Sequence, residues 1–294
     1  MARRTSAAPT ARVATPADRP VGGAPQHPDV WRAIDAQPTA AKLADTLELR
    51  GRTPAQVRLR RRFLRFVPVR PGQQVLEIGC GTGVVLRDLM AVVGRRGEVT
   101  GVDVSRTMLA RARALSRDVA GASLRLRHGD GNKLPFGPGR FDVALAITVI
   151  LHVADPLRVV KELARVTRAG GRVAVQDQDF GLVGAAHPDR ALTDRILDGV
   201  AARIYEEPCS GRRLPALLRE AGLEQVRVLA DIYQDTTLTD FSRAFLERRA
   251  ENAVRFGIVD EATAARWLEG FNEYLARGAF VLTMNYFGAV GVKR

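Results

Sequence analysis

The segment VLEIGCGTG, from Val75 to Gly83, constrains the fold of this chain more than any other stretch. Its apolar residues predict a buried β-strand over 73–79, and the three glycines that follow predict a tight turn before a helix. A glycine turn at the carboxyl end of a parallel strand lets a ligand approach the backbone closely. The segment therefore predicts an α/β fold with a ligand site at this turn.

Short apolar runs and helical patterns alternate along the rest of the chain. Further strands are expected at 98–103, 122–127, 141–147, 171–177, 224–231 and 279–290, and helices at 84–92, 106–117, 155–168 and 211–221. Such alternation is typical of βαβ units with right-handed crossovers. We therefore predict a three-layer, Rossmann-like α/β sheet of about seven mostly parallel strands, with the last strand antiparallel.

Several segments lie outside this alternation. Residues 1–27 read as a disordered basic tail, and residues 28–68 as an N-terminal helical lid in which Thr53-Pro54 starts the last helix. The main domain is expected at 69–294. It contains two insertions, a polar loop with a helical middle at 180–210 and two helices at 238–277. Long insertions of this kind tend to cover ligand sites.

The charge distribution and the cysteines limit the functional classes. Residues 1–70 carry 14 basic and 5 acidic side chains, and thus nine of the 13 net positive charges. A solvated surface in an arginine-rich sequence explains this pattern more simply than nucleic-acid binding does. Two cysteines cannot form a disulfide framework, and no Cys/His spacing indicates a metal. No apolar run is long enough to span a membrane. A cytoplasmic location is expected, although the arginine-rich leader leaves organelle targeting open.

Two acids follow the next two predicted strands at informative positions. Asp103, in GVDVS, lies twenty residues after Gly83, where a carboxylate can accept both hydroxyl groups of a ribose. Asp130, in HGDGN, could reach an adenine amino group. A dinucleotide fingerprint needs its third glycine at position 84, and Val84 stands there instead. The spacing therefore argues against an NAD-linked oxidoreductase.

Taken together, these motifs resemble the class I methyltransferases. The runs that carry the resemblance are VLEIGCGTG, GVDVSRTMLARAR, GDGNKLPF, FDVALAITVILHV and LARVTRAGGRVAV, in that order over about residues 70–180. They are similar to the small-molecule branch that includes ubiquinone and menaquinone methyltransferases. The resemblance implies that S-adenosylmethionine is the cofactor.

The resemblance also implies a role for each matching residue. Asp103 would hold the ribose hydroxyls, and Thr148 would lie near the methionine end of the cofactor. Beneath the loop, along the adenine faces and at the adenine edge, the implied contacts are Glu77, Gly79, Cys80, Gly81, Gly83, Val104, Met108, Asp130 and Gly131. Simpler readings remain open for some of these residues. Glu77 could pair with an arginine, Met108 and Cys80 could belong to the core, and Asp130 could form a turn.

The acceptor side is less marked in the sequence. A general base is needed only where the acceptor carries a proton at neutral pH. Candidates should follow strands four and five, which favours His152 first and Asp177 second as catalytic residues. Weaker candidates for substrate contact are Trp31, Asp179, His187 and Tyr286. Each candidate also has a structural reading, as a loop-bonding histidine, a cap or a core side chain.

We predict methyl transfer to an oxygen, nitrogen or carbon atom of a small-molecule acceptor, apolar or aromatic in part, by in-line displacement and without a metal. An RNA or DNA methyltransferase is an alternative, because the N-terminus is basic. The Asn/Asp-Pro-Pro-aromatic run of the enzymes that methylate exocyclic amines is missing, since Ile147-Thr148-Val149-Ile150 stands in its place. A non-catalytic S-adenosylmethionine-binding scaffold stays open. The sequence does not indicate an oligomeric state.

Overall fold

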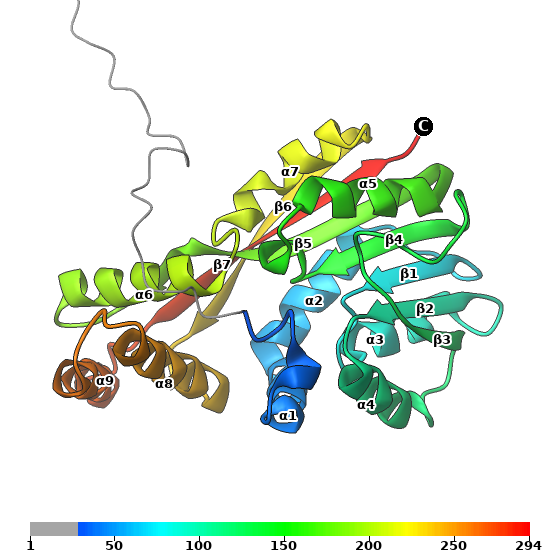
Figure 1. Cartoon of the computed structure of the whole chain (residues 1–294). Helices are drawn as coiled ribbons and strands as arrows, with labels where there is room; N and C mark the ends of the chain where they lie inside the picture. The colour runs from blue at the N-terminus through cyan, green and yellow to red at the C-terminus, as the bar shows by residue number, and fades with distance from the viewer. Residues whose placement is uncertain (1–28) are drawn as a thin grey trace, which may run out of the picture.

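A computed structural model describes residues 29–294, so the tail predicted for residues 1–27 lies outside the described residues. A seven-stranded sheet in the order β3-β2-β1-β4-β5-β7-β6 forms the centre of the molecule (Figure 1). The strands are β1 (Gln74–Ile78), β2 (Glu98–Asp103), β3 (Ser123–His128), β4 (Phe141–Ile147), β5 (Thr167–Ala185), β6 (Glu224–Asp235) and β7 (Leu282–Val292). Strand β7 runs antiparallel to both of its neighbours, and the other pairs are parallel. The predicted fold class is confirmed.

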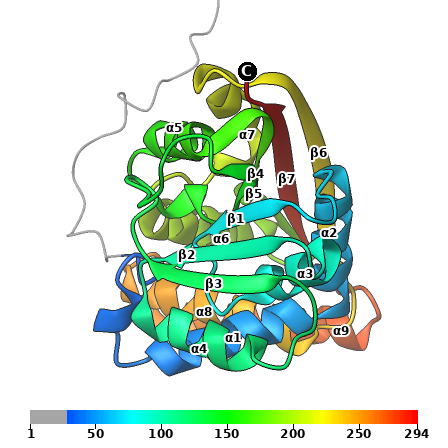
Figure 2. The same cartoon turned by 90° about the vertical axis from the view of Figure 1, so that its right-hand side faces the viewer.

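Helices cover both faces of the parallel half of the sheet (Figure 2). On one face, α5 (Pro156–Val166) and α7 (Ser210–Glu220) pack against side chains of β1, β4 and β5. On the other face, α2 (Pro54–Phe66), α3 (Val84–Val93) and α4 (Arg106–Ser116) pack against the opposite side chains of the same strands and β2. Burial on both faces explains why the central strands are continuous apolar runs rather than alternating ones.

The antiparallel half has its own apolar cluster. Helices α6 (Arg190–Ile204), α8 (Asp240–Arg255) and α9 (Glu261–Ala276) pack against the ends of β5, β6 and β7, with Trp267 and Phe271 fully buried among them. Figure 1 shows α8 and α9 side by side beyond the parallel strands. The two helices predicted within 238–277 are therefore confirmed.

The polar loop expected from residue 180 is wrong at its start. Strand β5 continues to Ala185, because Gly184 and Ala185 pair with Thr283 and Leu282 of β7 after a bulge that follows Asp179. The partner strand β7 lies about 100 residues further along the chain, so its pairing leaves no local signal in the sequence. The polar composition after residue 179 therefore predicts a strand that is too short. The helical middle of the segment is α6.

The N-terminal segment forms a short helical layer. The start of the predicted helical lid, residues 29–36, is mostly turn, with only the 3₁₀ helix η2 (Ile34–Ala36), and α1 (Ala40–Arg52) follows it. Helix α2 begins at Pro54 after Thr53, as predicted. Its Phe63 lies so close to Gly288 of β7 that a Cβ there would be 2.6 Å from the ring. Glycine at 288 therefore permits α2 to dock on the sheet.

Within residues 29–294, no helix has the length and apolar character needed to cross a membrane. The same residues contain no group of three or more His, Cys, Asp or Glu side chains arranged to hold a metal ion.

Candidate functional site: a cavity shared by the glycine loop and the helical cap

A cavity of about 840 Å³ opens at the carboxyl ends of β1, β2 and β4. Its walls come from three regions that are distant in the chain: the loops after these strands, η2 with α1, and α6 with α8. Nine residues singled out from the sequence line it: Trp31, Gly79, Gly81, Asp103, Val104, Asp130, Gly131, Thr148 and His152. The fold thus brings most of the predicted cofactor residues together with one predicted base.

The glycine loop forms one wall of this cavity. Gly79, Gly81 and Gly83 have φ of +59°, +51° and +79°, a region that side chains with a Cβ rarely adopt. A Cβ on Gly79 would also lie 2.4 Å from the Val149 side chain. The three glycines are thus required by the turn itself, and the turn brings backbone atoms to the cavity surface at Gly79 and Gly81.

Asp103 closes the loop from the end of β2. Its carboxylate accepts hydrogen bonds from the Gly81 and Ser105 amides, both at 2.8 Å. Burial raises the pKa of Asp103, and these backbone hydrogen bonds oppose the rise. The side chain is 7% exposed and borders the cavity. Asp103 therefore fixes the loop and also presents a carboxylate edge to a ligand.

Glu77 lies beneath the loop on β1. It is fully buried, its Oε2 has no hydrogen-bond partner, and it borders a second cavity of about 100 Å³. Burial raises its pKa well above the ordinary value, and the nearby Asp103 carboxylate raises it further. An acceptor left unpaired in a buried position favours a cationic ligand group close by.

Thr148 borders both cavities at the end of β4. Its φ is +56°, an uncommon value for a β-branched residue, and its amide donates to the Gln176 carbonyl at 2.6 Å. Strained backbone of this kind persists where the surrounding structure enforces it, often at ligand sites. Thr148 therefore borders the candidate site, and its position near the methionine end of the cofactor stays a prediction.

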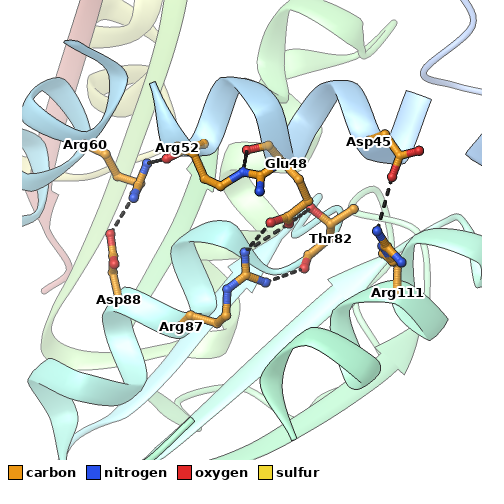
Figure 3. Close-up of polar contacts among 9 residues, drawn as sticks. Asp45, Glu48, Arg52, Arg60, Thr82, Arg87, Asp88 and Arg111 are labelled. Atoms are coloured by element: carbon orange, nitrogen blue, oxygen red, sulfur yellow. Dashed lines mark hydrogen bonds and ion pairs between the residues drawn. The ribbon is translucent and has the colours of Figure 1, made fainter. Parts of the chain in front are cut away.

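Helix α1 is clamped over the glycine loop by charged side chains (Figure 3). Glu48 accepts from Thr82 Oγ1 at 2.6 Å and from Arg87 at 2.9 Å on both carboxylate oxygens. Asp45 pairs with Arg111 of α4 at 3.1 Å. The N-terminal segment predicted as a lid thus contacts the glycine loop and helices α3 and α4.

Three predicted cofactor residues lie elsewhere or behave differently. Met108 is fully buried against Ile34, Leu43 and Ala44 and lines neither cavity, so its placement matches the core alternative. Asp130 accepts from the Asn132 backbone amide and side chain, as a turn former does, yet it also lines the cavity. Cys80 is buried, and burial raises the pKa of its thiol, as expected of a packed residue.

His152 lies in the 3₁₀ helix η3 (Ile150–His152) after β4. Its Nδ1 is 2.5 Å from Oδ2 of Asp29, a carboxylate that is 6% exposed and comes from the start of the described chain. The rings of Trp31 and Tyr205 flank the imidazole at 6.3 Å and 5.6 Å between centroids. A histidine held through one ring nitrogen by a buried carboxylate is a common arrangement for a general base.

The aromatic wall continues away from His152. Tyr205 stacks on Phe180 at 4.3 Å between ring centroids and an interplanar angle of 7°. Both residues and Phe245 of α8 line the cavity. Phe63 is not part of this wall and is buried between α2 and the sheet. An apolar body with hydroxyl or aromatic character would fit this wall.

Four other predicted residues lie outside the large cavity. Asp177 is fully buried, accepts from the Leu151 amide and Ser210 Oγ, and has one oxygen without a partner. Burial raises its pKa to about 7. Because it lines neither cavity, its placement does not support a catalytic role, and it anchors the loop that carries His152.

The remaining substrate candidates are placed in structural contacts. Asp179 forms a two-pronged ion pair with Arg212 at 2.5 and 2.6 Å. His187 bonds the Trp267 carbonyl at 2.9 Å. Tyr286 accepts from two glutamines and borders only the small cavity. Polar residues near a strand end therefore face the site less often here than the sequence suggested.

Asp29, Glu48 and Arg249 are among the residues of the site that were not selected from the sequence. Asp29 and Glu48 occur in helical or turn segments rich in ordinary surface charges, with no motif around them. Arg249 is 4% exposed on a helix that looks like a normal amphipathic one. Burial separates Asp29 and Arg249 from neighbouring charged residues, and pairing with Arg87 separates the partly buried Glu48.

Comparisons with known proteins agree with this geometry. Residues 76–175 match the family described as "Methyltransferase domain". The chain is 40% identical over 157 residues to a phosphatidylethanolamine N-methyltransferase of Cereibacter sphaeroides, covering 51% of this chain and 75% of the relative. It is 34% identical over 181 residues to 27-O-demethylrifamycin SV methyltransferase of Amycolatopsis mediterranei, covering 58% and 61% of the two chains.

A solved structure shares the fold. It is phosphoethanolamine N-methyltransferase 2 of Haemonchus contortus with S-adenosylhomocysteine, with a TM-score of 0.57 and 19% identity over 90% of this chain and 60% of that one. The chain belongs to the class I methyltransferases that use S-adenosylmethionine. It spans between about half and two thirds of the length of the first curated relatives it matches.

Proposed function

We propose that this protein transfers the methyl group of S-adenosylmethionine to a hydroxyl oxygen of a small, partly aromatic acceptor. The observation that carries the proposal is the His152–Asp29 pair at 2.5 Å, on the wall of the cavity that Asp103 and the glycine loop also line. A hydroxyl group carries a proton that has to leave, whereas many amines do not need a base. A named O-methyltransferase among the relatives supports the same chemistry.

The residues around the glycine loop fit the cofactor. Asp103 has the position to accept the ribose hydroxyls, while Val104, 44% exposed at the cavity, offers an apolar surface to the adenine. The unpaired Glu77 oxygen lies on the side of Gly79 where an ammonium group would be stabilised. When bound, S-adenosylmethionine supplies an electrophilic methyl carbon.

Arg50 completes this cofactor site from α1. It borders both cavities next to Gly79, Gly81 and Thr148. A guanidinium there is suited to the carboxylate of the methionine part, since arginine binds carboxylates through two parallel hydrogen bonds. We assign Arg50 this role.

On the acceptor side, His152 accepts the hydroxyl proton at Nε2 while Asp29 holds Nδ1. The carboxylate fixes the ring orientation and stabilises the imidazolium that forms. Trp31, Tyr205 and Phe180 exclude water and position the acceptor, which is the larger part of catalysis in an in-line displacement.

The test is a methylation assay with mass spectrometry. Purified protein is incubated with S-adenosylmethionine and extracted metabolites, and the products are searched for a gain of one methyl group on oxygen. The variant His152→Gln should bind S-adenosylhomocysteine normally and lower kcat by about 100- to 10,000-fold. Methylation of RNA alone, or unchanged turnover by His152→Gln, would contradict the proposal.

A further inference from the structure

One charged side chain in the cavity has no role in cofactor binding or proton transfer. Arg249, on the inner face of α8, lines the cavity next to the aromatic wall. Only 4% of the residue is exposed. Its guanidinium lies over three rings, with Cζ 4.9 Å from Phe180, 5.6 Å from Tyr205 and 4.8 Å from Phe245.

The polar contacts of Arg249 are incomplete. One terminal nitrogen donates to the Tyr205 hydroxyl at 3.3 Å, and the other, Nη1, is buried without any hydrogen-bond partner. Arginine stays charged in proteins, so this is a buried positive charge with one donor unused. Contact with aromatic rings compensates for only part of the hydration free energy that the guanidinium loses when it leaves water.

The carboxylates that adjoin Tyr205 and Phe180 in the sequence are paired with other arginines, and Glu251, which follows Arg249 on α8 and also borders the cavity, forms no ion pair with it. Glu206 pairs with Arg32, Glu207 with Arg213, and Asp179 with Arg212. Among residues 29–294, no carboxylate oxygen lies within 4.0 Å of a guanidinium nitrogen of Arg249, the distance that defines an ion pair. Buried charges in proteins are normally paired, so the missing anion has to come from a ligand.

We infer that Arg249 is the binding site for a carboxylate group of the acceptor. Its planar guanidinium matches the two oxygens of a carboxylate, and the rings around it remove the water that would weaken the pair. Tyr205 touches both Arg249 and the His152 ring, so it separates the charged end of the acceptor from the reacting end. This inference rests on the proposed function and adds to it the substrate class: a hydroxylated apolar carboxylic acid.

Direct binding tests the inference without any turnover. The protein is saturated with S-adenosylhomocysteine and titrated calorimetrically with 4-hydroxycinnamate and, separately, with the neutral 4-hydroxycinnamamide of the same shape. We expect the carboxylate to bind at least about tenfold more tightly than the amide. Arg249→Met should abolish this preference. Arg243→Gln, an exposed arginine on the same helix that lines no cavity, should keep it.

A stability measurement excludes a purely structural arginine. If Arg249 serves a ligand, Arg249→Met should melt at the same temperature as the wild type or higher, because it removes an uncompensated buried charge. If Arg249→Met fails to fold, Arg249→Lys replaces it in the titration. Lysine keeps the positive charge but lacks the planar pair of guanidinium donors, so this variant should show a reduced preference for the carboxylate.

The inference is overturned if the wild type binds both probes equally or binds neither, or if a folded Arg249 variant retains the preference. Failure of S-adenosylhomocysteine to bind would instead overturn the proposed function. The two failures are therefore distinguishable in the same titration series.

Discussion

The two walls of the cavity differ in the parts of the protein that form them. The wall at β1 and β2 presents backbone atoms of a glycine turn, held by Asp103 from an adjacent strand. The opposite wall contains no glycine and is formed by residues of the N-terminal segment, η3, α6 and α8. Backbone geometry suits a cofactor that never changes, and side chains suit an acceptor that differs from one enzyme to another.

The difference also appears in the order of the elements along the chain. Gly81 lies in the loop after β1, and Asp103, 22 residues further along the chain, ends the neighbouring parallel strand β2. Asp29 and His152 are 123 residues apart, and their contact depends on where the N-terminal layer docks. The cofactor wall is thus one βαβ unit, whereas the acceptor wall exists only in the complete fold.

The largest expected effect lies on the cofactor wall. Asp103→Ala removes the acceptor of the Gly81 amide as well as the ribose contact, so it should weaken S-adenosylhomocysteine binding by about 100-fold or more. Calorimetry measures this, with the exposed Asp118→Ala as the control. Equal affinities of the two variants would show that this wall does not hold the cofactor.

The acceptor wall should respond in kcat and not in cofactor affinity. Asp29→Asn leaves His152 in place but without the carboxylate that orients it and stabilises its charged form, so kcat should fall about 10- to 100-fold. The exposed Asp118→Asn is the control. A drop in cofactor affinity that accounts for the whole loss would contradict the separation of the two walls.

Asp177, which anchors the loop that carries His152, also makes the folding stability depend on pH. Its pKa in the folded state is about 7, raised by burial, whereas the unfolded value is about 3.9. Below pH 4 both states hold the proton. Between pH 4 and 7 only the folded state does, so stability falls as the pH rises, and above pH 7 the full cost is present.

Asp177→Asn removes this titration and can keep the acceptor for Leu151 and Ser210. As the pH rises from 4 to 7, the ratio of folded to unfolded wild-type protein should fall relative to that of the variant, by up to about tenfold per pH unit. Urea unfolding at several pH values measures it. Parallel pH profiles of the two proteins would show that the folded state does not hold this proton.

The smallest effect is expected at the clamp of α1. Glu48→Gln weakens the partly buried pair with Arg87 and the bond from Thr82, so S-adenosylhomocysteine affinity should fall about three- to tenfold. Glu273→Gln, in an exposed helical pair with Arg277, should change nothing. A loss as large as that of Asp103→Ala would contradict this ranking and show that the docking of α1 contributes as much to cofactor binding as Asp103 does.

The sequence by itself determined the sheet, its strand directions and the place of the glycine loop. These follow from local rules: apolar runs form buried strands, glycine is needed where φ is positive, and parallel strands end at one edge. Residues such as Gly79, Asp103 and Thr148 could be placed for that reason. Met108 could not, because a helical period gives the apolar face without saying what covers it.

Tertiary structure alone decided the acceptor side. Asp177 and Asp179 were expected at the end of the fifth strand, but they lie within the longer β5, where Ser210 and Arg212 of α7 engage them inside the protein. Asp29 and Arg249 look like ordinary surface charges until packing buries them beside His152 and Phe180. Burial and pairing between distant segments depend on how the whole chain packs, and no local pattern encodes them.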